Sequence, residues 1–195
     1  GIVAGSNAAQ YGKGKEPFIL DRSEAYIGVL IDDLVTKEST EPYRMMTSRA
    51  EYRLLLRQDN ADLRLTKRGY EVGLISKERY EGVLEKERLI AEEIERVKSV
   101  NIGTGAQVQE LMQQYGSTEL KTGATLAELI KRPELSYQAL ALLDPHRPQL
   151  REDIAEQVNI NLKYEGYIER QLRQVEHFKK LPANSFSHRN RHCHN

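Results

Sequence analysis

The sequence is poor in cysteine, lacks tryptophan and carries no net charge. Cys193 is the single cysteine among 195 residues, which excludes an internal disulfide or a metal site of several cysteines and indicates a reducing, cytoplasmic compartment. No apolar run approaches the roughly 20 residues that a membrane-spanning helix needs. The 29 basic residues balance 29 acidic ones, so only local clustering, and not net charge, can argue for nucleic-acid binding.

Motifs of several enzyme classes are missing as well. The chain contains no phosphate-binding P-loop, no dinucleotide-binding glycine fingerprint after a strand, no HExxH and no GxSxG. Asp32 and Asp33 are adjacent, and adjacent side chains on a helix point about 100° apart, so they do not converge as an acid–base pair. His146 lies between two prolines, a setting typical of a surface residue. We therefore predict no catalytic residue in this chain.

The C-terminal end is a basic, histidine-rich tail. A mobile tail offers no preformed geometry for a metal ion, so we predict no metal site there. We expect residues 183–195 to be disordered or non-native. The side chains in this tail that could bind a metal are His188, His192, Cys193 and His194.

Apolar residues recur at helical spacing from about Ser23 onward, and this pattern outweighs any β signal. Ser23 is placed to cap one helix, and Ser76 is placed to cap a long helix that reaches about Val97. One long helix is expected over 150–181, with a bend or close packing at Gly166. The predicted fold class is all-α, a helical bundle with a short piece of a flavin-binding domain before it.

Two segments have the spacing of a capping box, in which a threonine and a residue three positions later cap the start of a helix. They are Thr104–Gln107 and Thr125–Glu128. Gly116 fits the end of the helix that the first box would start.

The densest basic stretch lies between residues 43 and 68. Read as a helix from Ser48, it places Arg49, Arg53 and Arg57 on one face. Like charges at this spacing repel one another, so acidic neighbours or an anionic ligand must offset them. From the pattern alone, a solvated face paired with carboxylates is the favoured interpretation. Phosphate binding is the alternative, because tyrosines interleave with the basic residues. The stretch contains Tyr43, Arg44, Arg49, Tyr52, Arg53, Arg57, Arg64, Lys67 and Arg68.

The run from Leu20 to Leu65 resembles the C-terminal helical region of the MnmG (GidA) family. The segments that carry the resemblance are EPYRM, TSRAEYRLLLR and DNADLRLT, and the later KYEGYIERQ at 163–171. The opening GIVAGSNAA is similar to the end of the family's flavin-domain signature. The resemblance covers roughly residues 1–182, and it implies three segments: a remnant of the FAD-binding domain with a linker at 1–17, the helical domain at 18–182 and the tail at 183–195.

The resemblance implies an enzyme that installs a C5 carboxymethylaminomethyl group on the wobble uridine of tRNA. The full-length protein would bind FAD, use NADH, form a homodimer and work with a GTPase partner of the MnmE type. This chain would dock tRNA and the partner, and by itself would bind no cofactor and catalyse no reaction. The residues expected to contact FAD, together with the missing domain, are Gly1, Gly5 and Asn7. The candidates for tRNA binding are Arg44, Arg49, Arg53, Arg57 and Arg64.

A second hypothesis assigns the arginines a structural role. They would pair with carboxylates inside the domain and order its interface with the flavin domain, so the chain would be an interaction module. The carboxylates available for such pairs are Asp32, Asp33, Glu51, Asp59 and Asp62.

Overall fold

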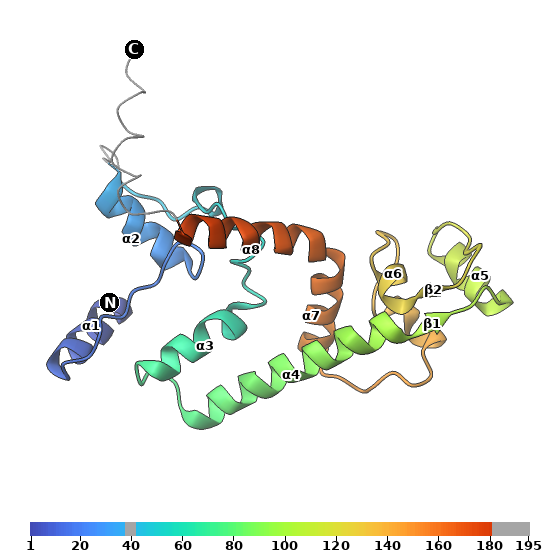
Figure 1. Ribbon diagram of the computed structural model, residues 1–195, viewed down its shortest axis with the longest axis horizontal. Coiled ribbons are helices and arrows are strands. Elements are labelled where there is room, and N and C mark those ends of the chain that lie inside the picture. The colour runs from blue at the N-terminus through green and yellow to red at the C-terminus, as the bar shows by residue number, and fades with distance from the viewer. Residues whose placement is uncertain (38–41, 181–195) are drawn as a thin grey trace, which may run out of the picture.

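The computed structural model describes residues 1–37 and 42–180, which fold mainly as helices (Figure 1). The predicted all-α class is confirmed. The predicted tail at 183–195, with Cys193, lies outside the described residues. The helices are α1 (Ile2–Gly12), α2 (Tyr26–Thr36), α3 (Ala61–Glu71), α4 (Lys77–Ser99), α5 (Ala106–Gln114), α6 (Leu126–Ile130), α7 (Glu152–Lys163) and α8 (Glu165–Lys180). The shorter elements are the 3-10 turns η1 (Thr47–Arg49) and η2 (Ala139–Leu143) and the strands β1 (Asn101–Ile102) and β2 (Ala124–Thr125).

Helix α4, with 23 residues, is the axis on which the neighbouring helices pack (Figure 1). It begins where the sequence predicts, because the Ser76 hydroxyl accepts a hydrogen bond from the Arg79 backbone N–H at 3.3 Å. Its buried side combines apolar and charged residues, so ion pairs as well as apolar contacts attach its neighbours. The buried residues are Lys86, Ile90, Glu93 and Val97.

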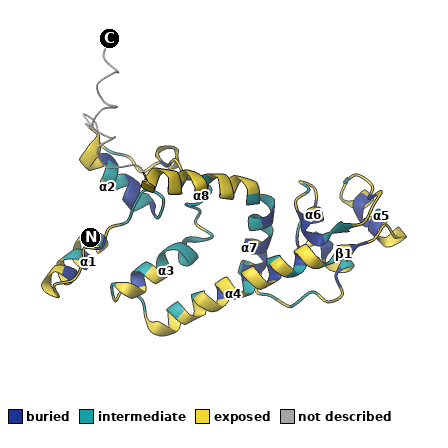
Figure 2. Ribbon diagram, in the orientation of Figure 1, coloured by how far each residue is buried: buried dark blue, intermediate teal, exposed yellow. Residues whose placement is uncertain are grey.

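The main hydrophobic core lies where α6 and α7 pack against α4 (Figure 2). Leu129 from α6 and Val158 from α7 are fully buried there, and α5 adds Met112. Met112 therefore packs in the core, as its helical spacing predicts. Burial of such side chains stabilises the fold by roughly 1.5–3 kcal/mol each.

The small unit around α5 and α6 contains one confirmed and one wrong capping prediction. The Thr125 hydroxyl accepts from the Glu128 N–H at 3.2 Å, and the Glu128 carboxylate accepts from the Thr125 N–H at 2.7 Å, which makes a complete capping box. Thr104 does not cap α5, whose N-cap is Gly105 without a side-chain hydrogen bond. Gly116 ends this unit's first helix with φ +66°, as predicted.

The pattern over 150–181 forms two helices, and not the single long helix that we expect from its spacing. The break lies at Tyr164, between α7 and α8, two positions before the predicted bend at Gly166. A Cβ atom on Gly166 would meet nothing within 4 Å, so close packing is not the reason for this glycine. After the break, α8 runs from the top of α7 toward α2 (Figure 1).

Helix α2 begins at Tyr26, and Ser23 does not cap it. The backbone N–H and the hydroxyl of Ser23 both donate to the Asp21 carboxylate instead. The chain before α2 crosses this helix closely, because a Cβ atom on Gly28 would lie 2.3 Å from the Asp21 carbonyl oxygen. Glycine is therefore required at position 28.

The segment from Ser48 to Arg57 is not the helix that its sequence predicts. Only η1 and isolated turns form there. The reason is a second, smaller apolar cluster, in which Ala50 and Leu56 pack with Val29 of α2. Residues six positions apart do not share a helix face, so burying both requires an irregular path. Tertiary packing outweighs helix propensity in this segment.

None of the described helices combines the length and apolar character needed to cross a membrane. Across 1–37 and 42–180, no group of three metal-binding side chains converges. His146 is exposed, as its place between prolines predicts.

Candidate nucleic-acid interface

Arg22 is the centre of an ion-pair network. This network holds the arginine-rich segment, which is the basic stretch at residues 43–68, in place. Its guanidinium Nη1 lies 2.9 Å from Asp32 Oδ2 and 2.6 Å from Asp33 Oδ1, both on α2. Its Nη2 lies 2.6 Å from Glu51 Oε1 and donates to the Arg49 carbonyl at 3.3 Å. One guanidinium therefore joins α2 to the segment that follows η1.

Asp33 is the buried member of this network, with only 2% of its side chain exposed. Burial by itself raises the pKa of Asp33, but hydrogen bonds from Lys37, Arg22 and Tyr43 outweigh burial and lower this pKa to about 2. Asp33 therefore carries its negative charge at neutral pH, and it accepts from Tyr43 Oη at 2.9 Å. Tyr43, at the start of the arginine-rich segment, is thus fixed to α2 as well.

Two of the five predicted arginines, Arg57 and Arg64, make contacts within the domain. Arg57 Nε lies 3.2 Å from Asp59 Oδ1, and Asp59 Oδ2 also accepts from Gln157 of α7 at 2.6 Å. Arg64 donates to Asn60 Oδ1 at 2.8 Å and to the carbonyl oxygens of Glu24 and Arg57. Burial and the nearby Arg57 lower the pKa of Arg64. Both guanidinium groups tie segments of the fold together.

The other three predicted arginines are exposed. The Arg49 guanidinium lies over the Tyr43 ring, 4.3 Å from its centroid. Arg44 and Arg53 make no ion pair with a carboxylate anywhere in residues 1–37 and 42–180. Their positive charge is therefore available to an anionic partner at this surface.

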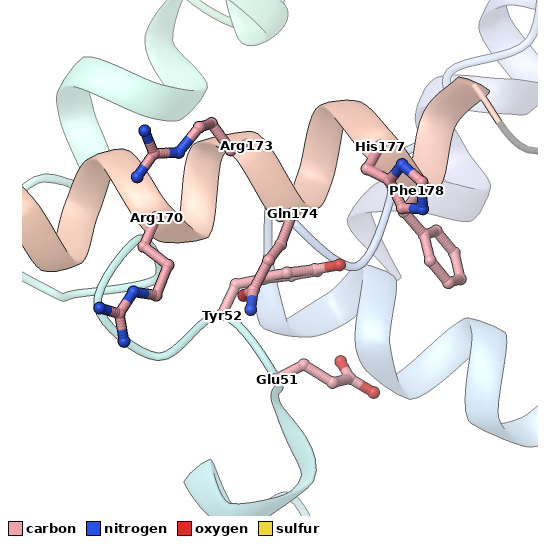
Figure 3. A pocket seen from close by; sticks show the side chains of 7 residues that line it. All are labelled: Glu51, Tyr52, Arg170, Arg173, Gln174, His177 and Phe178. Atoms are coloured by element: carbon pink, nitrogen blue, oxygen red, sulfur yellow. The ribbon is translucent and has the colours of Figure 1, made fainter.

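A surface pocket lies between the arginine-rich segment and α8 (Figure 3). Tyr52 lies on one side of it, and Gln174 of α8 points toward Tyr52. Arg170 and Arg173 bring two further exposed guanidinium groups, which no carboxylate of the described chain pairs. The pocket is lined by Glu51, Tyr52, Arg170, Arg173, Gln174, His177 and Phe178.

Sequence reasoning missed the basic residues outside the stretch 43–68. Arg22 pairs with residues 10 to 29 positions away, and no local periodicity reveals such a partner. Arg170 comes to the pocket only because the chain turns at Tyr164. The available signal was the resemblance, since Arg22 lies in the run 20–65 and Arg170 in KYEGYIERQ.

The residues expected to contact FAD together with the missing domain lie at the start of α1, where Gly1 is the N-cap, and on α1 itself, which contains Gly5 and Asn7. The Asn7 amide is already used, because Nδ2 donates to the Phe18 carbonyl at 2.9 Å and Oδ1 accepts from the Phe18 N–H at 2.7 Å. A Cβ atom on Gly1 or Gly5 would meet nothing within 4 Å, so no other described part of the chain covers this bare face of α1. Asn7 therefore holds the backbone of Phe18, and contact of Gly1, Gly5 and Asn7 with FAD stays a prediction for the whole enzyme.

The fold and the site define an all-α domain in which a partly buried ion-pair network supports a surface of exposed arginines. A family described as tRNA modifying enzyme MnmG/GidA C-terminal helical domain matches residues 77–172. Curated proteins named tRNA uridine 5-carboxymethylaminomethyl modification enzyme MnmG match over 93% of this chain, from Lachnoclostridium phytofermentans at 64% identity and from Caldicellulosiruptor saccharolyticus at 61%. Two crystal forms of Aquifex aeolicus GidA match at 43% identity, with TM-scores of 0.78 over 93% of this chain and 0.75 over 92%.

The chain belongs to the MnmG/GidA family and corresponds to its C-terminal helical region. It spans 29% of the length of the curated relatives, and 28% and 27% of the two Aquifex chains.

Proposed function

We propose that this chain is the tRNA-docking part of an enzyme that modifies a tRNA uridine. The relatives' name supplies the substrate class. The observation that carries the docking role is the set of exposed guanidinium groups without a carboxylate partner in the described chain. Arginine binds phosphate through paired N–H donors, and such contacts give most of the affinity of a protein for a nucleic-acid backbone. The groups assigned to phosphate are those of Arg44, Arg49 and Arg53.

The structural hypothesis has support for a different set of arginines. Arg22, Arg57 and Arg64 are each occupied by carboxylates or carbonyls of the domain. We assign these three to holding the arginine-rich segment in its irregular path. The two hypotheses therefore apply to different residues, and they need not exclude each other.

The chemistry belongs to the whole enzyme in this proposal. FAD and NADH would bind domains that the relatives have in the remaining part of their length, and the bare face of α1 would pack toward them. The GTPase partner of the MnmE type and a homodimer are further expectations for the whole enzyme. The part assigned to residues 18–180 is to hold the tRNA while other domains act on it.

Titration of a fluorescent tRNA with the chain and its variants tests the docking role. R53A removes an exposed guanidinium without a carboxylate partner, and we expect weaker binding. R88A is the matched control, because Arg88 is also exposed but pairs with Glu85 and Glu92 at 2.5 Å on α4. Equal tRNA affinity for R53A, R88A and the unchanged chain would contradict the proposal.

A further inference from the structure

The pocket beside α8 is an open hollow at the surface, and its size suits a small group. Its volume is about 480 Å³, and ligand sites in proteins have roughly 300–1,000 Å³. The Tyr52 ring is partly buried on one side of it. In Figure 3, Arg170 lies on one side of Tyr52, while His177 and Phe178 lie on the other. The Tyr52 ring thus lies between a cationic side chain and two further ring side chains.

The acidic residue at this pocket is engaged in an ion pair. Glu51 Oε1 lies 2.6 Å from Arg22 Nη2, and Glu51 Oε2 accepts from Arg22 Nε at 3.2 Å. Arg170 and Arg173, by contrast, have no carboxylate partner within the described part of the chain. The pocket is therefore lined by two guanidinium groups and one carboxylate, so the net charge of its lining is positive.

Helix α8 lies at the surface of the fold, and none of its residues is fully buried. Burial in the core therefore does not explain the exposed arginines on its pocket-lining face. The far end of the helix is held in place, because Lys179 Nζ lies 3.0 Å from Asp21 Oδ2. This ion pair joins the end of α8 beside the pocket to the chain before α2.

We propose that this pocket binds one unpaired nucleotide of an RNA, with the base stacked on Tyr52 and the adjoining phosphate against Arg170. The Gln174 amide, which donates and accepts, faces the edge of the base. Stacking on an aromatic ring together with arginine contacts to phosphate is the chemistry by which proteins hold single-stranded RNA. A paired base is not available for such stacking, so the pocket selects loops over duplexes. This inference rests on the proposed docking of tRNA, and it adds a site that reads unpaired nucleotides.

The test compares two RNAs on the 195-residue chain. One is a hairpin with an unpaired loop, and the other is the same stem closed as a blunt duplex of equal charge. We expect the hairpin to bind more tightly. Y52A should lose about fivefold or more in hairpin affinity, with little change for the duplex, since stacking on one aromatic ring contributes at least that much. Y52F keeps the ring and should keep the preference, and R170A should weaken it.

L172A is the matched control, because Leu172 is exposed on α8 but does not line the pocket. A thermal melt of each variant separates lost binding from lost folding, and Y52F and R170A keep the test decisive if Y52A unfolds. A hairpin preference that survives in both Y52A and R170A would overturn the proposal that the pocket binds a nucleotide. It would leave the proposed docking of phosphate intact. Failure of both RNAs to bind would overturn the proposed docking itself. Tyr52-dependent binding of a polyglutamate peptide, without any hairpin preference, would assign the pocket to an acidic protein and overturn the RNA inference.

Discussion

The ammonium group of Lys86 lies 3.1 Å from the Asp153 carboxylate, and this ion pair joins α4 to α7. The same ammonium lies 2.9 Å from Asp62 Oδ2 on α3, although only 6% of the lysine side chain is exposed. Burial by itself lowers the pKa of Lys86, but hydrogen bonds to both carboxylates outweigh burial and raise it. One buried cation thus holds three helices together.

We therefore expect K86M to lower the free energy of unfolding by about 1–2 kcal/mol. Removing one partner of a fully buried pair costs roughly 3–5 kcal/mol, but both carboxylates are partly exposed to water, which reduces the cost. K77M is the matched control on the same helix, since Lys77 is exposed and, within the described residues, its ion pair is with Glu81 at 3.5 Å. Its effect should stay within about 0.5 kcal/mol in urea unfolding. Equal losses in the two variants would contradict the role of Lys86.

The Arg22–Asp33 pair predicts a specific loss of stability in acid. The folded-state pKa of Asp33, about 2, lies below the ordinary value of 3.8. Its contribution is therefore fully present above about pH 4 and is lost as the pH falls toward about 2, and it amounts to roughly 2 kcal/mol. D33N lacks this titration. The difference in unfolding free energy between the unchanged chain and D33N should be large at about pH 7 and small at about pH 2. A difference that stays constant with pH would refute this assignment.

The two segments with the spacing of a capping box, of which only Thr125–Glu128 forms one, should respond differently to the same substitution. T125A removes a hydroxyl that caps α6, so it should cost about 1 kcal/mol. T104A removes a hydroxyl that caps nothing, because Gly105 is the N-cap of α5, and it should change stability by less than about 0.5 kcal/mol. Thermal unfolding of both variants measures the contrast. The same loss at both positions would mean that Thr104 also caps a helix.

Two glycines on helices should respond in opposite ways to alanine. G28A places a Cβ atom 2.3 Å from the Asp21 carbonyl oxygen, so the chain before α2 must shift, and we expect a loss of about 1–3 kcal/mol. G82A lies in α4, where a Cβ atom meets nothing within 4 Å, and alanine should stabilise the helix by about 0.5–1 kcal/mol. Urea unfolding of G28A, G82A and the unchanged chain measures both changes in the free energy of unfolding. Tolerance of G28A would show that the close crossing beside α2 is not required.

Several features that depend on neighbouring residues could be predicted from the sequence, although Ser23 does not cap α2 and Thr104 does not cap α5. Ser76 and Thr125 cap helices as expected, because capping is a contact over three positions. Val97 and Ile90 face the core, because the helical period alone places them there. The family resemblance rested on contiguous runs, and it too is confirmed.

The features that depend on distant residues could not be predicted from the sequence. The helix predicted from Ser48 does not form, since burial of Ala50 and Leu56 against Val29 decides the path of the segment. Asp33 was predicted as a partner for the arginines of the stretch 43–68, but its guanidinium partner is Arg22. No period in a sequence shows which of many arginines lies near a given carboxylate after folding. The assignment of Arg44, Arg49 and Arg53 to RNA stays a prediction.

The salt dependence of tRNA binding tests that assignment most directly. Each phosphate contact releases counterions, so the slope of log affinity against log salt falls by about one for each contact that is removed. The triple variant R44A/R49A/R53A should therefore bind tRNA more weakly, with a slope smaller by about three than that of the unchanged chain. An affinity and a slope that match those of the unchanged chain, in a variant that melts normally, would contradict the central claim that these arginines hold the tRNA backbone.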